Sequence, residues 1–342
     1  GRMITGFLTP SRESGFTWPP ELKEQLGDYP AGLEYDHSST LKQKDDRHML
    51  DSIIEISRKR FETFMRLYRE KPPAFAIFYV KSTDILGHLL WDKRDLLLEY
   101  YKLLDRELGE IMVLAGASAN IMITSDHGFE DAATHGFYVN TWLAQHGYYP
   151  QAKNRGVGDW LDRHKGIKHF LKKILRIARY DLAEGKRKRA ENVTGALAWF
   201  DTIVPIGIRV SPKAPSDTID KIIAELKTEE FEGKPVLRLV TRREELFSGP
   251  HVHMAPEIII LPEHRFMVYG LREPNIIAPL VGTRTRKGDH NAAINAVFMA
   301  CGPAVVGRQR DLNIKIYDVF ATIMKLYGIM NAPSDGTPID LS

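Results

Sequence analysis

The chain has 342 residues, of which 43% are hydrophobic and 27% charged, and its net charge is only +3. This composition indicates a globular protein with enough apolar residues for one elaborated domain or two smaller ones. The single cysteine, Cys301, excludes an internal disulfide, and no apolar run is long enough to span a membrane. With no signal-peptide pattern either, these features predict a soluble, cytoplasmic protein.

The first half of the chain alternates between helical and strand patterns. A long amphipathic helix is predicted from Asp46 to Lys71, where Pro72-Pro73 ends it. The apolar run from Ala74 to Val80 predicts a strand buried on both faces. A second helix from Arg94 to Ala115 and a second strand from Asn120 to Thr124 follow. Apolar strands separated by a helix are typical of a parallel sheet covered by helices.

The middle of the chain carries a local excess of positive charge. Between Lys153 and Glu191 there are thirteen Lys and Arg against five Asp and Glu, a net charge of +8. We therefore predict a basic helical insertion over residues 150–192 of a core formed by residues 1–149 and 193–342. A solvated helix face explains this charge best. A groove for an anionic substrate, a nucleic acid or a membrane surface are alternatives.

The second half continues with a mixture of strands and helices. Ala196 to Val210 holds one or two strands, helices are predicted over Asp217–Thr228 and Ile316–Tyr327, and strands over Val236–Val240, Glu257–Leu261 and Asn295–Cys301. The whole pattern predicts an α/β fold.

Acidic and imidazole side chains follow both strands of the first half. Asp84 and His88 come after the first strand, with a spacing that places them on one face of a helix. Asp126 and His127 come directly after the second. The carboxyl ends of parallel strands meet at one edge of a sheet, so these four side chains should lie close together. Carboxylate and imidazole ligands suit zinc or manganese, whereas a single cysteine excludes a thiolate site.

A further histidine, His290, follows Gly288-Asp289 just before the last predicted core strand. Two acid–histidine pairs and one more imidazole nearly complete a two-metal site. Such a site stabilises the attacking and leaving oxygens of a phosphoryl or sulfuryl group.

The ordered set Asp84-x-x-x-His88, Asp126-His127-Gly128 and His290 resembles the alkaline phosphatase superfamily. It is most similar to the type I phosphodiesterase/nucleotide pyrophosphatase branch, and especially to archaeal and bacterial predicted phosphohydrolases. Supporting stretches run along nearly the whole chain: Ile4 to Pro10, Ser248-Gly249-Pro250, Ala255-Pro256-Glu257, Gly302-Pro303, Tyr317-Asp318-Val319 and Asp335-Gly336.

This resemblance implies a mostly parallel central sheet with helices on both faces and two divalent metal ions, zinc in the first place and manganese as an alternative. One ion would be held by Asp84, His88 and His290, and the other by Asp126 and His127. The implied reaction is in-line transfer of the phosphoryl group of a phosphodiester or pyrophosphate. The substrate would be a small phosphate ester such as a nucleotide.

Two features of the family pattern are not found in this sequence. The resemblance implies a further aspartate and a Ser or Thr nucleophile upstream of the stretch Gly6 to Pro10. Tyr35 to Thr40 has suitable atoms but no apolar strand before it. The chain thus resembles the C-terminal two-thirds of such an enzyme, with a fold incomplete at its N-terminus. The sheet would then expose an edge, which predicts a homo-oligomer or an N-terminal segment supplied in trans.

Other functions stay open at this point. A sulfatase or a phosphatase of the same superfamily would use the same metal chemistry. A catalytically incomplete metal-binding or assembly module is the alternative from another class. Binding of nucleic acid through residues 168–189 is less favoured than either, and no membrane partner is expected.

Three further sites have competing interpretations. His251 and His253 alternate as metal ligands can, but the prolines around them favour a loop. His135 fits a substrate-contacting residue and a loop residue equally well. Asp318 is best explained as a negative charge near the start of the last helix.

Overall fold

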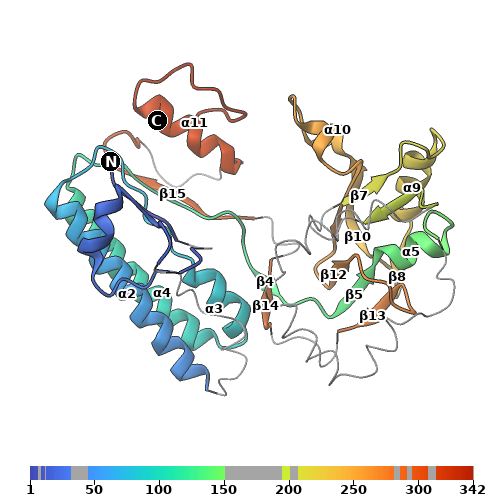
Figure 1. Ribbon diagram of the computed structural model, residues 1–342, viewed down its shortest axis with the longest axis horizontal. Coiled ribbons are helices and arrows are strands. Elements are labelled where there is room, and N and C mark those ends of the chain that lie inside the picture. The colour runs from blue at the N-terminus through green and yellow to red at the C-terminus, as the bar shows by residue number, and fades with distance from the viewer. Residues whose placement is uncertain are drawn as a thin grey trace. The chain divides into compact units, whose positions relative to one another are not determined.

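Two groups of secondary-structure elements make up the described part of the chain in this computed structural model (Figure 1). Unit 1 comprises Gly1–Ala132 and Arg284–Ser342, and unit 2 comprises Ala133–Thr283. The structure describes residues 1–6, 9–11, 13–31, 45–150, 195–200, 207–280, 286–290, 295–306 and 313–341. Most of the predicted basic insertion, and the stretch Tyr35 to Thr40, lie outside these residues. A single core over residues 1–149 and 193–342 stays a prediction.

Unit 1 combines helices with short strands. Its helices are η1 (Pro20–Leu26), α2 (Asp46–Glu70), α3 (Ser82–Leu90), α4 (Arg94–Ala115) and α11 (Ile316–Leu326), and its strands are β1 (Met3–Ile4), β2 (Thr17–Trp18), β3 (Ile121–Thr124), β4 (Glu130–Asp131), β14 (Gly288–Asp289) and β15 (Phe298–Cys301). No helix in the described part of the chain is both long enough and apolar enough to cross a membrane.

Three helices form the core of unit 1. The long helices α2 and α4 pack against each other and against α3 (Figure 1). Leu50 and Ile53 of α2, Leu86 and Leu90 of α3, and Tyr100 of α4 are almost completely buried in one cluster. The two long helices are confirmed, since both begin where the sequence predicts. This core fixes α3, which carries two of the predicted metal ligands.

The strands of unit 1 differ from the predicted parallel arrangement. β15 pairs with β3 in the antiparallel direction, from Phe298 opposite Thr124 to Cys301 opposite Ile121. The prediction of a strand buried on both faces at residues 74–80 is wrong, because this segment forms no strand and Ile77 is 74% exposed. Burial on both faces needs hydrogen-bonded neighbours, and none of the described strands pairs with it. The α/β character is confirmed, but a central parallel sheet is not.

Unit 2 is built around small, mainly antiparallel sheets. Its strands are β5 (His135–Tyr138), β6 (Ala198–Phe200), β7 (Gly207–Val210), β8 (Glu230–Phe231), β9 (Lys234–Pro235), β10 (Leu237–Arg242), β11 (Ile258–Pro262), β12 (Phe266–Tyr269) and β13 (Ile277–Pro279), and its helices are α5 (Val139–Gln145), α9 (Thr218–Lys227), α10 (Arg243–Leu246) and η3 (Val252–Met254).

The largest sheet of unit 2 has the order β10-β11-β7-β6, and all of its pairs are antiparallel. A second sheet joins β5 to β12 in parallel and to β13 in the antiparallel direction. Their apolar residues form one core with α5 and α9, in which Trp142, Phe200 and Ile222 are fully buried or nearly so. The helix predicted over Asp217–Thr228 corresponds to α9.

Two glycines let α3 pack closely against β14 and against Phe129 within unit 1. A Cβ atom at Gly288 would lie 2.4 Å from the carbonyl oxygen of Gly87 and 2.7 Å from the Cβ of Trp91. A Cβ at Gly87 would lie 2.7 Å from the ring of Phe129. These separations are far below van der Waals contact, so only glycine permits this packing. The approach brings the residue after β14, His290, next to α3.

This packing predicts opposite effects for two Gly→Ala substitutions in unit 1. Gly288→Ala should lower the free energy of unfolding by about 1–3 kcal/mol, because the added methyl group meets backbone that cannot move aside. Gly109→Ala should raise it by about 0.8 kcal/mol, because Gly109 lies inside α4 with open space around it and alanine favours the helix. Urea unfolding measures both. Equal effects of the two substitutions would contradict the close approach of α3 and β14.

Candidate metal centre

Helix α3 presents two ligands on one face. Asp84 lies in its first turn and His88 one turn later, and the Nε2 atom of His88 is 3.4 Å from the Oδ1 atom of Asp84. The i, i+4 spacing produces this proximity. His88 is buried, with 3% of its surface exposed, so its imidazole is directed into unit 1 and not to solvent.

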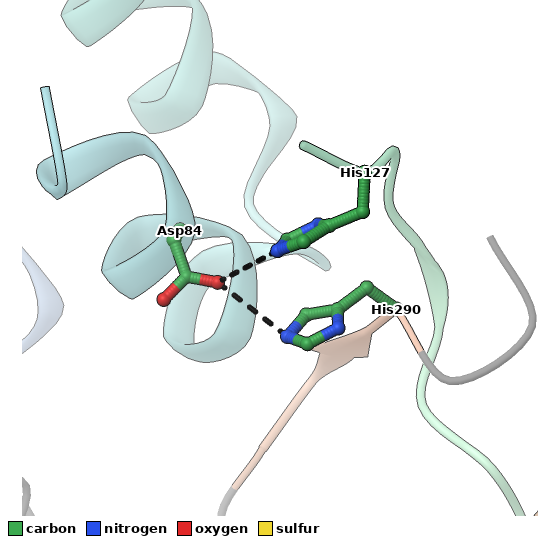
Figure 2. Close-up of side chains that lie close together, drawn as sticks. All are labelled: Asp84, His127 and His290. Carbon is green, nitrogen blue, oxygen red and sulfur yellow. Dashed lines mark ion pairs between the residues drawn. The ribbon is translucent and has the colours of Figure 1, made fainter. Parts of the chain in front are cut away.

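The loop after β3 supplies the next histidine. The Nε2 atom of His127 lies 3.8 Å from Asp84 Oδ1 (Figure 2). It also lies 3.6 Å from the Oδ1 atom of Asp126. The Asp126 side chain is 82% exposed. His127 is therefore close to both carboxylates, and the geometry does not divide these residues into two separate ligand sets.

The residue after β14 completes the cluster. His290 Nε2 lies 3.6 Å from Asp84 Oδ1, and the imidazole of His290 stacks on that of His127 with 3.8 Å between ring centroids (Figure 2). β14 is held against β4 by the antiparallel pairs Gly288 with Asp131 and Asp289 with Glu130. This pairing joins two parts of the chain that are about 160 residues apart in sequence.

The donor set fits a divalent metal ion. Asp84 Oδ1 is buried and has no hydrogen-bond partner among the described residues, although three imidazole nitrogens face it at 3.4–3.8 Å. These separations are too long for hydrogen bonds. Tetrahedral zinc with ligand bonds of about 2.0–2.2 Å would hold its ligand atoms roughly 3.3 Å apart. A buried oxygen that lacks a proton donor but faces nitrogen lone pairs is what a cation would satisfy.

Two overlapping groups of residues bring their ligand atoms within 4.8 Å of one another. The first is Asp84, His127 and His290, and the second is His88, Asp289 and His290. Four of the five predicted ligands therefore belong to one or both of these groups: Asp84, His88, His127 and His290. Asp126 contributes an exposed carboxylate beside His127 and belongs to neither group. Asp289, which is almost fully buried, was not predicted as a ligand.

Hydrogen bonds to the other ring nitrogens orient two of the imidazoles. His88 Nδ1 lies 2.9 Å from the carbonyl oxygen of Gly288, and His127 Nδ1 lies 2.9 Å from that of Gly128. A carbonyl oxygen only accepts, so each Nδ1 carries the proton and each Nε2 keeps its lone pair. This second layer of contacts is typical of metal-binding histidines.

The electrostatic surroundings also favour ligand forms of these side chains. Burial alone would raise the pKa of Asp84, but the hydrogen bond from the Lys81 ammonium and the nearby His88 bring it below its usual range. Burial lowers the pKa of His88, and burial together with the charge of His127 lowers that of His290. A deprotonated carboxylate and neutral imidazoles are the forms that bind metal.

Phe129 is a further residue of this site that the sequence did not single out. Its ring lies 5.0 Å from the ring of His88, 5.8 Å from that of His127 and 5.5 Å from that of His290, measured between centroids. It forms an apolar wall against which all three imidazoles rest, with Gly87 behind it. Its position directly after Asp-His-Gly was the only available signal.

The other singled-out residues have structural contacts. His253 Nδ1 lies 2.9 Å from the carbonyl oxygen of Pro250 at the start of η3, which agrees with the loop interpretation. His135 belongs to unit 2, where its Nδ1 lies 2.9 Å from Thr134 Oγ1. The carboxylate of Asp318 accepts a hydrogen bond from the backbone N–H of Lys315 at the start of α11, which confirms its role at that helix end.

A comparison with known families decides the class of the protein. The model of the type I phosphodiesterase / nucleotide pyrophosphatase family matches residues 6–293, which is most of the chain. The chain belongs to this family. The type I phosphodiesterase / nucleotide pyrophosphatase family is part of the alkaline phosphatase superfamily, so the resemblance seen in the sequence is confirmed. A search of curated proteins finds no match.

Membership of the family carries general chemical consequences. Its members are phosphodiesterase- or pyrophosphatase-type hydrolases that act on phosphate esters such as nucleotides, and they typically depend on divalent metal ions. The cluster around Asp84 supplies candidate ligands for such ions.

The unequal burial of the two aspartates predicts unequal effects on zinc binding. Asp84→Asn should weaken binding by about 100-fold or more, because a buried charged ligand is lost. Asp126→Asn should weaken it by less than about tenfold, because the exposed carboxylate is surrounded by water that can replace it. Isothermal titration of the metal-free protein with zinc measures both. A larger effect of Asp126→Asn would contradict the central place of Asp84.

Proposed function

We propose that the protein hydrolyses phosphodiester or pyrophosphate bonds by in-line phosphoryl transfer at a two-metal site. The observation that carries this proposal is the buried oxygen of Asp84, which three imidazoles face without donating a hydrogen bond. Family membership supports the substrate class. The proposed substrate is a small phosphate ester, in the first place a nucleotide.

The ligands are assigned to two ions. Asp84, His88 and His290 would hold the first, and Asp126 and His127 would contribute to the second. When bound, the ions supply positive charge that stabilises the charge developing on the phosphoryl group in the transition state. Zinc suits this mixture of imidazole and carboxylate ligands, and manganese is the alternative.

The protein's own residues prepare the site. The Lys81 ammonium binds one oxygen of Asp84 and leaves the other directed at the histidines. The low pKa of His88 and of His290 keeps both imidazoles neutral at neutral pH. Phe129 covers the inner side of the three rings and limits the access of water there.

We assign the attacking hydroxyl to a segment other than those described. Thr83 and Ser125 directly precede the ligands Asp84 and Asp126 in sequence, and the hydroxyl groups of both contact the backbone. Ser125 Oγ accepts a hydrogen bond of 2.8 Å from the backbone N–H of Val297, and Thr83 Oγ1 donates to the carbonyl oxygen of Val80. A nucleophile needs an activating base or ion next to it, and these contacts supply neither.

The exposed segment at residues 75–80 favours a second candidate function, a metal-binding module that works in assembly with another polypeptide. Ile77 is 74% and Tyr79 59% exposed, and they alternate with the half-buried Phe78, which packs on α2. An apolar segment with which none of the described strands pairs can accept a strand from a second copy or from a further segment supplied in trans. The same assembly would bring in the missing hydroxyl. A cytoplasmic location stays a prediction from the sequence.

Zinc-dependent recognition of a phosphate ester tests the proposal directly. We expect adenosine monophosphate to bind only to the zinc-loaded protein, and this binding to be lost in Asp84→Ala. Asp105→Ala is the matched control, because Asp105 is an exposed carboxylate on α4. Isothermal titration measures binding, and hydrolysis of bis(p-nitrophenyl) phosphate measures turnover.

The outcomes separate the two candidates. Turnover that depends on Asp84 would support the hydrolase and contradict an external hydroxyl. Zinc binding without binding of the nucleotide and without turnover would contradict the hydrolase and support the assembly module.

A further inference from the structure

A cluster of three buried hydroxyl groups joins the helices of unit 1. Ser57 Oγ lies 2.8 Å from the hydroxyl of Tyr100 and 3.0 Å from Ser82 Oγ. Tyr100 is fully buried, and the two serines are 7% and 5% exposed. Ser57 lies in α2, Ser82 in α3 and Tyr100 in α4. Each hydrogen bond therefore connects two different helices.

The surroundings of this cluster are apolar. Leu50, Ile53, Leu86 and Leu103 belong to the same buried core. Each hydroxyl costs about 1–3 kcal/mol to bury without a partner, so the three groups are accommodated only in an arrangement where they bond to one another. Apolar burial has no directional requirement, whereas hydrogen bonds tolerate only a narrow range of distances and angles. The cluster therefore selects one position of α3 relative to α2 and α4.

This position bears directly on the candidate metal centre. Ser82 is the first residue of α3 and precedes Asp84 by two residues. The side-chain hydrogen bonds of Lys81 to Asp84 and of Thr83 to Val80 stay within this part of the chain, whereas the Ser82 hydroxyl connects the first turn to α2. His127 and His290, which face Asp84, come from loops outside the three helices. A shift of the first turn would move Asp84 away from both.

We propose that Ser57, Ser82 and Tyr100 form a positioning cluster that holds the first turn of α3 so that Asp84 meets His127 and His290. The inference rests on the proposed metal site. It assigns these hydroxyls to the affinity of that site for its metal and not only to the stability of the fold. None of the three touches the metal ligands' reactive atoms, so they are positioning residues and not catalytic residues.

Removal of the Tyr100 hydroxyl, with the aromatic ring kept, tests the cluster. Tyr100→Phe should weaken zinc binding by about tenfold, the lower end of the range for contacts that orient metal ligands. Ser82→Ala should act in the same direction and serves if Tyr100→Phe folds poorly. Thr322→Val is the matched control, because Thr322 is a buried residue of unit 1 whose hydroxyl donates to the Asp318 carbonyl oxygen and accepts from Ile339. It should leave the zinc affinity within about twofold.

Two further readouts distinguish positioning from stability alone. In the metal-free protein, Tyr100→Phe should speed hydrogen exchange of the amides in the first turn of α3. The triple variant Ser57→Ala/Ser82→Ala/Tyr100→Phe should regain part of the stability, since no hydroxyl of the cluster is then left unsatisfied, while its zinc affinity stays low. Isothermal titration with zinc, thermal unfolding and hydrogen exchange give these quantities.

Each result has a defined meaning. Lower stability with unchanged zinc affinity in both Tyr100→Phe and Ser82→Ala would overturn the positioning role and leave the metal site intact. An equal loss of zinc affinity in Thr322→Val would also overturn it. Failure of the unsubstituted protein to bind zinc would overturn the proposed function, and the positioning role with it.

Discussion

The structure of unit 1 depends on one constraint, the burial of a carboxylate oxygen of Asp84 where only imidazole nitrogens face it. A buried anionic oxygen without a proton donor is unfavourable, and a cation between it and the imidazoles removes that cost. Lys81 neutralises the other oxygen and therefore fixes which one is directed at the histidines. The contacts of the described residues leave the first oxygen without a hydrogen bond, which supports the proposal that the site is organised around an ion.

Several elements with no chemistry of their own serve this constraint. The glycines at 87 and 288 allow α3 and β14 to approach until the rings of His88 and His290 lie next to each other. Phe129 fills the space beside Gly87 and supports the three rings. The pairing of β14 with β4 carries the last histidine to a loop that lies far away in sequence. The site thus depends on contacts within unit 1 that are weak singly and restrictive together.

The parts of this arrangement that the sequence predicted are those with local signals. Helix α4 ends at Ala115 because Gly116 takes a positive φ of 79°, which is typical of the residue after a helix. The direction of β15 was not predictable, because an apolar run has the same pattern in a parallel and an antiparallel strand. His290 was singled out by its place just before the last predicted core strand, and its assignment to the same ion as Asp84 came from the family resemblance. The exposure of residues 75–80 depends on whether another strand pairs with them, and the local sequence does not show this.

X-ray absorption spectroscopy of the zinc-loaded protein tests the central claim most directly. The account predicts a first shell of nitrogen and oxygen at about 2.0–2.1 Å, with the outer-shell scattering of at least two imidazoles and no sulfur. Zinc bound through Asp84, His88 and His290 gives this spectrum. A shell of oxygen alone without imidazole scattering, or a sulfur ligand from Cys301, would contradict it.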